Sequence, residues 1–314
     1  MQVFSDIEEF RNRTGDGVKT AVAIGKFDGI HKGHRRLIEE ITSCKEQGIG
    51  SLVFTFKSPI GDFFTKERSK VLSTEKEKIS LLEEMGVDYL YLMKVNKESV
   101  SYAPEYFVKD VLCQGLGAAM IAAGCDLSFG RGGEGDMALV NRMAGELSFE
   151  ARMIPHVMYK GNKISSTLIR DAVLAGRMEE AGEMLSRPYS IEGEITYGRQ
   201  LGRTIDMPTA NVIPEDDKLL PPFGVYFSRV TVGDETYRGL TNVGIKPTVS
   251  DEDKVCVETY IYGLDRDIYG KHMSVGLLHF VRPEMRFPNI EMLKKQMHDD
   301  SIKGISYFEK TEKI

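Results

Sequence analysis

Residues 20–38 read TAVAIGKFDGIHKGHRRLI, and this stretch decides the fold of the first half of the chain. The apolar run from Ala21 to Ile24 predicts a buried strand, which Gly25 ends. The turn KFDG follows, and apolar residues then recur at helical spacing up to Gly48, a typical helix stop. We therefore expect a strand, a glycine-bearing turn and the start of a helix in succession.

Two of the six histidines of the chain, His31 and His34, lie at the predicted helix start. A helix N-terminus presents unpaired N–H groups and the positive end of its dipole, which suits a phosphate group. Histidines three residues apart can donate to the same phosphate chain at this position. The alternative is that they only cap the helix. The strand before them, the turn and the amphipathic helix after them favour phosphate binding.

The composition describes an ordinary globular protein. The chain has 314 residues, with 41% hydrophobic and 28% charged residues, which predicts two domains. Its net charge of −6 argues against coating nucleic acid. The four cysteines are scattered without a CxxC pair, so we expect core residues in a reduced compartment instead of disulfides or a zinc site. Neither a signal peptide nor a membrane-spanning run is recognisable, which predicts a soluble, cytoplasmic protein.

The first 185 residues alternate strand and helix patterns. Apolar runs at 51–56, 87–95, 118–124 and 149–157 predict further strands, and Thr74 with Glu77 forms a possible capping box before a helix. Such alternation predicts a doubly wound, Rossmann-like parallel sheet. Because ligands bind at the carboxyl ends of such strands, the loops 25–34, 57–64 and 124–136 are candidate site loops.

The segment KISSTLIR, residues 163–170, closes this half. One hydroxyl could cap the helix that continues through residues 171–176, and this is the simpler interpretation. The functional interpretation is that the hydroxyls of Ser165, Ser166 and Thr167, with Arg170 one turn on, hold phosphates opposite the histidines. We favour it because these groups exceed what one cap requires.

Residues 189–282 contain short β-rich runs separated by Gly, Pro and Asp, without helical patterns between them. They predict an antiparallel β-barrel, and residues 288–310 predict a helix that packs against it. We place the domain boundary between residues 186 and 187, giving domains 1–186 and 187–314.

Two features of the second half carry candidate chemistry. The stretch GRQLGRTIDMPTAN, residues 198–211, includes Gly202 and Arg203 and suits a loop that approaches phosphates. Thr209 and Asn211 can both offer oxygen to one hard cation such as Mg²⁺. Glu258 lies mid-strand among apolar and aromatic neighbours. It is either an exposed-face residue, which is commoner, or a catalytic base, and spacing does not decide.

Taken together, these motifs resemble the bacterial bifunctional riboflavin kinase/FMN adenylyltransferase family (FAD synthetases) over nearly the whole chain. The first half carries the motif GxFDGxHxGH as Gly25–His34, a glycine-bounded loop at Gly124–Gly130 and ISSTxIR as Ile164–Arg170. The second half matches the family at residues 208–211, 220–226, 242–248, 257–259, 267–271 and 282–287.

The resemblance implies two consecutive reactions: riboflavin is phosphorylated by ATP to FMN, and FMN is adenylylated by a second ATP to FAD plus pyrophosphate. In the barrel, Glu258 would accept the hydroxyl proton, and Thr209 and Asn211 would bind Mg²⁺ and ATP phosphates. In the first domain, His31 and His34 would stabilise phosphate charge, while Ser166, Thr167 and Arg170 would clamp the phosphates. Binding positions are also implied for Gly25, Phe27, Asp28, Gly33, Asp126 and Ser165.

The sequence departs from the family pattern in three places: Ser58-Pro59-Ile60 replaces Pro-His-Pro, Leu127 replaces an aromatic residue, and Asp206 replaces a glycine. The implied partners are riboflavin, FMN and ATP, in a monomer or weak homo-oligomer. Three alternatives stay open at this point: an FMN adenylyltransferase with an inactive flavin-binding barrel, a non-catalytic flavin sensor, and a nucleotidylyltransferase for another phosphate ester.

Overall fold

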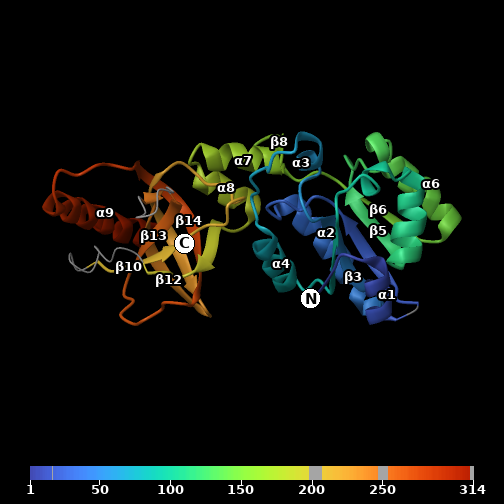
Figure 1. Cartoon of the computed structure of the whole chain (residues 1–314), viewed down its shortest axis with the longest axis horizontal. Helices are drawn as coiled ribbons and strands as arrows, with labels where there is room; N and C mark the ends of the chain where they lie inside the picture. Colours follow the sequence, from blue (N-terminus) through green and yellow to red (C-terminus); the bar gives the residue numbers. More distant parts are fainter. Residues whose placement is uncertain (16, 198–206, 247–253, 312–314) are drawn as a thin grey trace. The chain divides into compact units, whose positions relative to one another are not determined.

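The computed structural model describes residues 1–15, 17–197, 207–246 and 254–311. Contacts divide the chain into two units, Met1–Ser166 and Thr167–Ile314, many of whose elements are labelled in Figure 1. The predicted boundary at 186/187 stays a prediction. Among the described residues, no helix combines the length and the apolar character needed to span a bilayer.

The first unit is built on a six-stranded, all-parallel sheet in the order β1-β4-β3-β2-β5-β6. Its strands are β1 (Gln2–Phe4), β2 (Thr20–Ile24), β3 (Gly50–Phe56), β4 (Tyr89–Met93), β5 (Ala118–Gly124) and β6 (Glu150–Ile154). The predicted doubly wound sheet is confirmed. Because the chain runs from β2 through β3 to β4 and then returns to β5 on the other side of β2, the strand order reverses between β2 and β5. That is where such folds bind ligands.

Helices cover both faces of this sheet. They are α1 (Ile7–Thr14), α2 (Lys32–Ser43), α3 (Ile60–Thr65), α4 (Glu75–Glu84), α5 (Pro104–Tyr106) and α6 (Met137–Leu147). Alternation along β2 separates two cores: Val22 packs in the one that contains Phe10 of α1, and Ala23 in the one that contains Leu37 of α2. The Thr74–Glu77 capping box is present at the start of α4, as predicted.

Residues 103–117 do not form one regular α-helix. After α5 the backbone continues as a π-helix, Phe107–Gly115, and the Leu116 N–H donates to the Val111 carbonyl five residues back. Short 3₁₀ turns occur at Cys44–Gln47, Ser99–Ser101 and Arg131–Gly133, and a small hairpin pairs β7 (Met158–Tyr159) with β8 (Asn162–Lys163).

The second unit contains a six-stranded antiparallel sheet in the order β10-β13-β12-β11-β14-β9. Its elements are α8 (Met178–Leu185), β9 (Tyr189–Glu194), β10 (Thr209–Val212), β11 (Gly224–Val232), β12 (Glu235–Lys246), β13 (Lys254–Ile261), β14 (His272–Pro283) and α9 (Ile290–Thr311). Beyond β9, Thr196 bridges to Asn211 of β10, which brings the two edge strands together. This closure agrees with the predicted barrel. Helix α7 (Ser166–Leu174) links the two units.

The two faces of the barrel sheet differ in chemistry. On one face Phe308 of α9 packs with Val225, Phe227 and Leu240. On the other face the fully buried hydroxyls of Ser228, Thr241 and Thr259 form a ladder across three strands, with O···O distances of 2.7 and 2.9 Å. The ladder satisfies the hydrogen bonding of these buried hydroxyls. Glu258 lies on the opposite face of the sheet, the one that α9 covers.

Two candidate active sites

The turn after β2 has an unusual backbone. Phe27 and Ile30 have φ values of 48° and 41°, in the left-handed region that few non-glycine residues adopt. Both side chains are fully buried in the core on the α2 face, and this burial holds the strained turn in place. Asp28 Oδ1 accepts hydrogen bonds from the backbone N–H groups of Leu72 and Ser73, at 2.8 and 3.3 Å. Phe27 and Asp28 therefore shape the predicted binding turn.

His31 is the N-cap of α2. Its Nδ1 accepts hydrogen bonds from the N–H groups of Gly33 and His34 at 3.1 and 3.3 Å, and its side chain is buried. Because Nδ1 accepts, the ring hydrogen of a neutral His31 lies on Nε2, which is then a donor. A Cβ atom at Gly33 would lie 3.1 Å from the ring of His31, so the absence of a side chain at Gly33 makes room for the cap. His31 therefore caps the helix, and the cap leaves its Nε2 donor in place; phosphate binding by this nitrogen stays a prediction.

His34 stacks on His31, with 3.8 Å between ring centroids, and lies 4.9 Å from the Phe27 ring. Burial, with the neighbouring charges of His31, Lys78 and Lys163, lowers the pKa of His34 well below its ordinary value of 6.5. His34 is therefore neutral near pH 7. Its buried Nδ1 has no hydrogen-bond partner among the described residues.

Lys78 and Lys163 give this site a positive potential that sequence reasoning missed. Lys78 comes from α4, and burial lowers its pKa. Lys163 comes from β8. Both cations are close enough to His34 to lower its pKa, and together with the N-terminus of α2 they suit an anionic ligand. Lys78 belongs to a helix with many charged residues, so nothing in the local sequence distinguished it as a site residue. Lys163 could have been noticed, because it directly precedes the ISST motif.

The other predicted phosphate ligands divide between the two units. Ser166 Oγ donates to the Asp28 carbonyl at 2.9 Å, which ties the start of α7 to the turn after β2. Ser165 is half-buried beside it. Thr167 and Arg170 are counted with the second unit, so their position opposite the histidines stays a prediction. The Gly25 backbone continues β2 and donates its N–H to the Phe54 carbonyl of β3.

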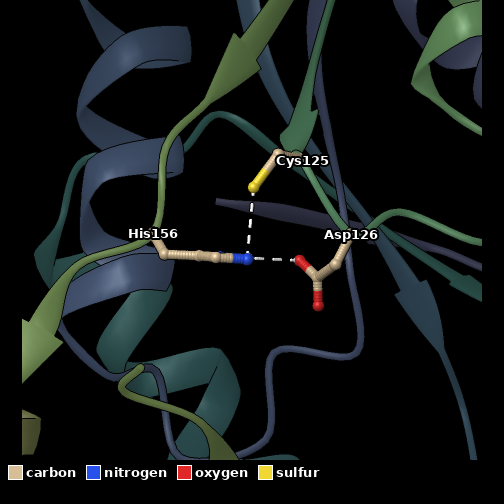
Figure 2. Close-up of side chains that lie close together, drawn as sticks. All are labelled: Cys125, Asp126 and His156. Atoms are coloured by element: carbon tan, nitrogen blue, oxygen red, sulfur yellow. Dashed lines mark hydrogen bonds and ion pairs between the residues drawn. The ribbon is translucent and has the colours of Figure 1, made fainter. Parts of the chain in front are cut away.

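Asp126 follows β5 on the other side of the switch point. It forms an ion pair with Lys163, and its Oδ1 lies 3.9 Å from Nδ1 of His156. Partial burial favours a higher pKa for Asp126, but the hydrogen bond and charge of Lys163 hold the pKa below its ordinary value. The preceding residue, Cys125, is exposed, with Sγ 3.2 Å from His156 Nε2 (Figure 2). The expectation that all four cysteines are core residues is therefore wrong for Cys125.

In the second unit, Thr209 and Glu258 are directly bonded. Thr209 Oγ1 donates to Glu258 Oε1 at 2.6 Å. The strand register places Glu258 between Asn211 of β10 and Asn242 of β12, so these three side chains leave the same face of the sheet. Asn211 is buried; its Nδ2 donates to the Thr209 carbonyl at 3.4 Å, and its Oδ1 accepts from Cys256. The structure thus brings together the three predicted barrel residues.

A second carboxylate, Glu284, stands near this group and was not singled out from the sequence. Asn242 Nδ2 donates to its Oε1 at 3.1 Å. A Cβ atom at Gly244 would lie 1.8 Å from the same oxygen, so any side chain at this position would displace the carboxylate from its place against β12. The sequence feature that could have identified Glu284 is its place in RPEMRF, residues 282–287, one of the stretches that match the family.

A cavity of about 630 Å³ opens beside Thr209, a volume within the usual range for small-ligand pockets. Pro208 and Ala210 line it together with residues 264–269, and Tyr269 in its wall stacks on Tyr197 at 3.8 Å. Gly202, Arg203 and Asp206 lie outside the described residues. Thr209 Oγ1, Asn211 Oδ1 and the Glu258 carboxylate are hard oxygen donors from neighbouring positions, a donor set that fits Mg²⁺.

Comparisons with known proteins also divide the chain into two parts with different matches. Residues 15–168 match the family model described as FAD synthetase, and residues 185–308 match the model described as riboflavin kinase. The bifunctional riboflavin kinase/FMN adenylyltransferases of Listeria monocytogenes and Escherichia coli K12 are each 32% identical to the chain. The former alignment covers 94% of both chains; the latter covers 91% of this chain and 92% of the relative.

Among solved structures, one from Streptococcus pneumoniae that bears the name macrolide-efflux protein is similar over 96% of this chain and 97% of its own. It superimposes with a TM-score of 0.80 at 28% sequence identity. The likeness therefore extends through both units, including the parallel sheet and the barrel.

Proposed function

Because the chain belongs to the bifunctional riboflavin kinase/FMN adenylyltransferase family, we propose that its barrel makes FMN from riboflavin and ATP and that its first unit makes FAD from FMN and ATP. The observation that supports this most is the Thr209–Glu258 hydrogen bond beside the 630 Å³ cavity, because it couples a candidate base to a candidate phosphate ligand. The paired histidines at the α2 N-terminus supply the corresponding argument for the first unit.

In the kinase reaction, the 5′-hydroxyl oxygen of riboflavin bonds to the γ-phosphorus of ATP, the bond to the bridging oxygen breaks, and ADP leaves. Glu258 accepts the hydroxyl proton, and the Thr209 hydroxyl orients its carboxylate. Thr209 and Asn211 are the residues that would hold Mg²⁺, which when bound supplies charge neutralisation for the phosphates. The remaining contribution of the barrel is to position the two substrates.

In the adenylyl transfer, a phosphate oxygen of FMN bonds to the α-phosphorus of ATP, and pyrophosphate leaves. The attacking group is already an anion, so the protein needs no general base. His31 donates from Nε2, and neutral His34, Lys78 and the positive end of the α2 dipole stabilise the charge on the phosphates. Thr167 and Arg170 are assigned to the phosphate clamp, with Gly202 and Arg203 in the corresponding role for the kinase.

The proposal extends to the setting of the enzyme. We infer that it works in the cytoplasm on small molecules, as a monomer or weak homo-oligomer, without a nucleic-acid partner. The net charge of −6 supports the last point, since nucleic-acid binding relies on clustered positive charge.

A chromatographic time course with riboflavin, ATP and Mg²⁺ tests both reactions, with a parallel run started from FMN. We expect FMN first and FAD after it. FAD formed only from supplied FMN would show that the barrel does not phosphorylate riboflavin. No product in either run, with flavin still bound, would contradict both reactions and leave a flavin sensor.

A further inference from the structure

We propose that Cys125, Asp126 and His156 form a binding site for a zinc-class divalent cation at the carboxyl edge of the first unit's sheet. Figure 2 shows the three side chains pointing toward one another. One ligand atom from each, a thiol sulfur, a carboxylate oxygen and an imidazole nitrogen, lies within 4.8 Å of the other two. Neither reaction proposed above uses Cys125 or His156.

The backbone that carries the three ligands is fixed by adjacent strands. Cys125 and Asp126 directly follow β5, and His156 follows β6, its parallel neighbour, in which Ile154 pairs with Gly124. The Cys125 N–H donates to the Ile154 carbonyl at 3.3 Å, so pairing continues up to the first ligand. A cation would therefore meet ligands that are held close together before it arrives.

The donor set and its spacing suit zinc. Zinc binds thiolate, imidazole and carboxylate groups in a tetrahedron, and typical bond lengths place its sulfur and nitrogen ligands roughly 3.6 Å apart. Cys125 Sγ and His156 Nε2 are 3.2 Å apart, so a small side-chain rotation opens the required space. A thiolate also selects against Mg²⁺, which prefers oxygen ligands. Three protein ligands leave a fourth position for water or a substrate atom.

Lys163 limits the affinity of this site without blocking it. The ammonium group of Lys163 pairs with Oδ2 of Asp126, whereas Oδ1 faces His156. The cation can therefore take Oδ1 while the ion pair persists on Oδ2. The charge of Lys163 nevertheless repels a second cation nearby, so its removal is expected to tighten metal binding.

Occupation of the site has a consequence that rests on the proposed function and on the binding position that the family resemblance implies for Asp126 in adenylyl transfer. A metal ion on Oδ1 withdraws that oxygen from the substrates. Zinc should then slow FAD formation from FMN and leave FMN formation from riboflavin unchanged, because the kinase site lies in the other unit.

The binding test is a titration of the reduced, metal-free full chain with Co²⁺, followed by thiolate-to-cobalt charge-transfer absorption and then by displacement with Zn²⁺. The wild type and the control Cys113→Ser should develop the band, and Cys125→Ser should lose it. His156→Gln should weaken binding at least about tenfold, and Lys163→Gln should strengthen it by a similar factor. No band in the wild type, or a band that survives in Cys125→Ser, would overturn the site.

A measurement on the wild type alone guards against misfolded variants. Zinc should slow the alkylation of Cys125 at least about tenfold, as read by peptide mass spectrometry; an unchanged rate would also overturn the site. The activity arm is separate, because FAD formation is first measured without zinc. If zinc binds and FAD formation continues at full rate in the wild type, the metal site stands and the regulatory consequence is refuted.

Discussion

The ring of His31 lies 3.8 Å from the ring of His34, and their planes differ by 15°. Two imidazoles this close repel each other if both are protonated, and burial further disfavours a charge on His34. In the proposed phosphate site the pair would therefore act through hydrogen bonds. The positive potential of the site comes from Lys78, Lys163 and the α2 N-terminus instead.

The two roles of His31 can be separated by substitution. Asparagine is a good N-cap but lacks the distant Nε2 donor, whereas alanine provides neither function. We expect His31→Asn to keep the thermal stability of the first unit and to lower FAD formation from FMN by about 10²–10³-fold. His31→Ala should show the same loss and, in addition, cost about 1 kcal/mol of unfolding free energy.

The measurement combines thermal unfolding, followed by circular dichroism because the chain has no tryptophan, with FAD formation from supplied FMN. Kinase activity on riboflavin is the internal control, since His31 belongs to the other unit. Full adenylyl transfer by His31→Asn would reduce His31 to a cap.

His34 should make the stability of the first unit depend on pH. The folded unit keeps His34 neutral at pH values where the unfolded chain binds a proton, because its folded pKa lies well below 6.5. The free energy of unfolding therefore falls as the pH drops below about 6.5, at up to about 1.4 kcal/mol per pH unit for this group. Above about pH 6.5, His34 is neutral in both the folded and the unfolded chain, so it no longer changes the free energy of unfolding with pH.

Urea denaturation of the wild type and of His34→Asn, between about pH 5 and about pH 7.5, isolates this effect because other titrating groups cancel in the difference. The variant should lose less stability on acidification than the wild type. Parallel curves would mean that His34 titrates alike in the folded and unfolded chains.

Much of the fold followed from local pattern. The run Ala21–Ile24, the stop at Gly48 and the Thr74–Glu77 box each report on their own neighbourhood, and each corresponds to an observed feature. Strand β1 escaped prediction because a three-residue strand shows too little alternation to read. The π-helix at Phe107–Gly115 has the same apolar spacing as an α-helix over a short span.

The site was predictable only where its residues are adjacent in sequence. The position of His31 and His34 at a helix start follows from the apolar pattern before and after them, but the cap through Nδ1 and the left-handed Phe27 depend on packing. Lys78 and Glu284 reach their sites through topology, across intervals that no local window covers. A single sequence records neither contact.

Gly33 offers a test of packing around the cap. Alanine normally stabilises a helix relative to glycine by roughly 1 kcal/mol. At Gly33, however, a Cβ atom would lie 3.1–3.2 Å from the His31 ring and displace the capping nitrogen. We expect Gly33→Ala to lose that gain and to lower adenylyl transfer at least about tenfold, because the His31 donor moves.

The matched control is Gly145→Ala in α6, where nothing lies within 4 Å of the added Cβ atom. It should raise the unfolding free energy by roughly 0.5–1 kcal/mol and leave adenylyl transfer unchanged. Equal stabilisation by both substitutions, with full activity, would show that the His31 ring tolerates the extra atom.

Glu258→Gln separates the basicity of Glu258 from its structural contact. Glutamine retains an oxygen that can accept the Thr209 hydrogen bond but cannot take up the riboflavin proton. FMN formation should fall by about 10²–10⁴-fold, while FAD formation from supplied FMN continues at the wild-type rate. Product chromatography of the two half-reactions measures both outcomes.

Glu194→Gln, at the exposed end of β9, is the control for loss of one carboxylate from the barrel. It should leave FMN formation and FAD formation unchanged. Thr209→Ser keeps the orienting hydroxyl and should retain more kinase activity than Thr209→Val, which removes both the hydrogen bond to Glu258 and the proposed metal ligand. FMN formation by Glu258→Gln at the wild-type rate would exclude Glu258 as the base. The neighbouring carboxylate of Glu284, held by Asn242 across the sheet, would then be the next group to substitute.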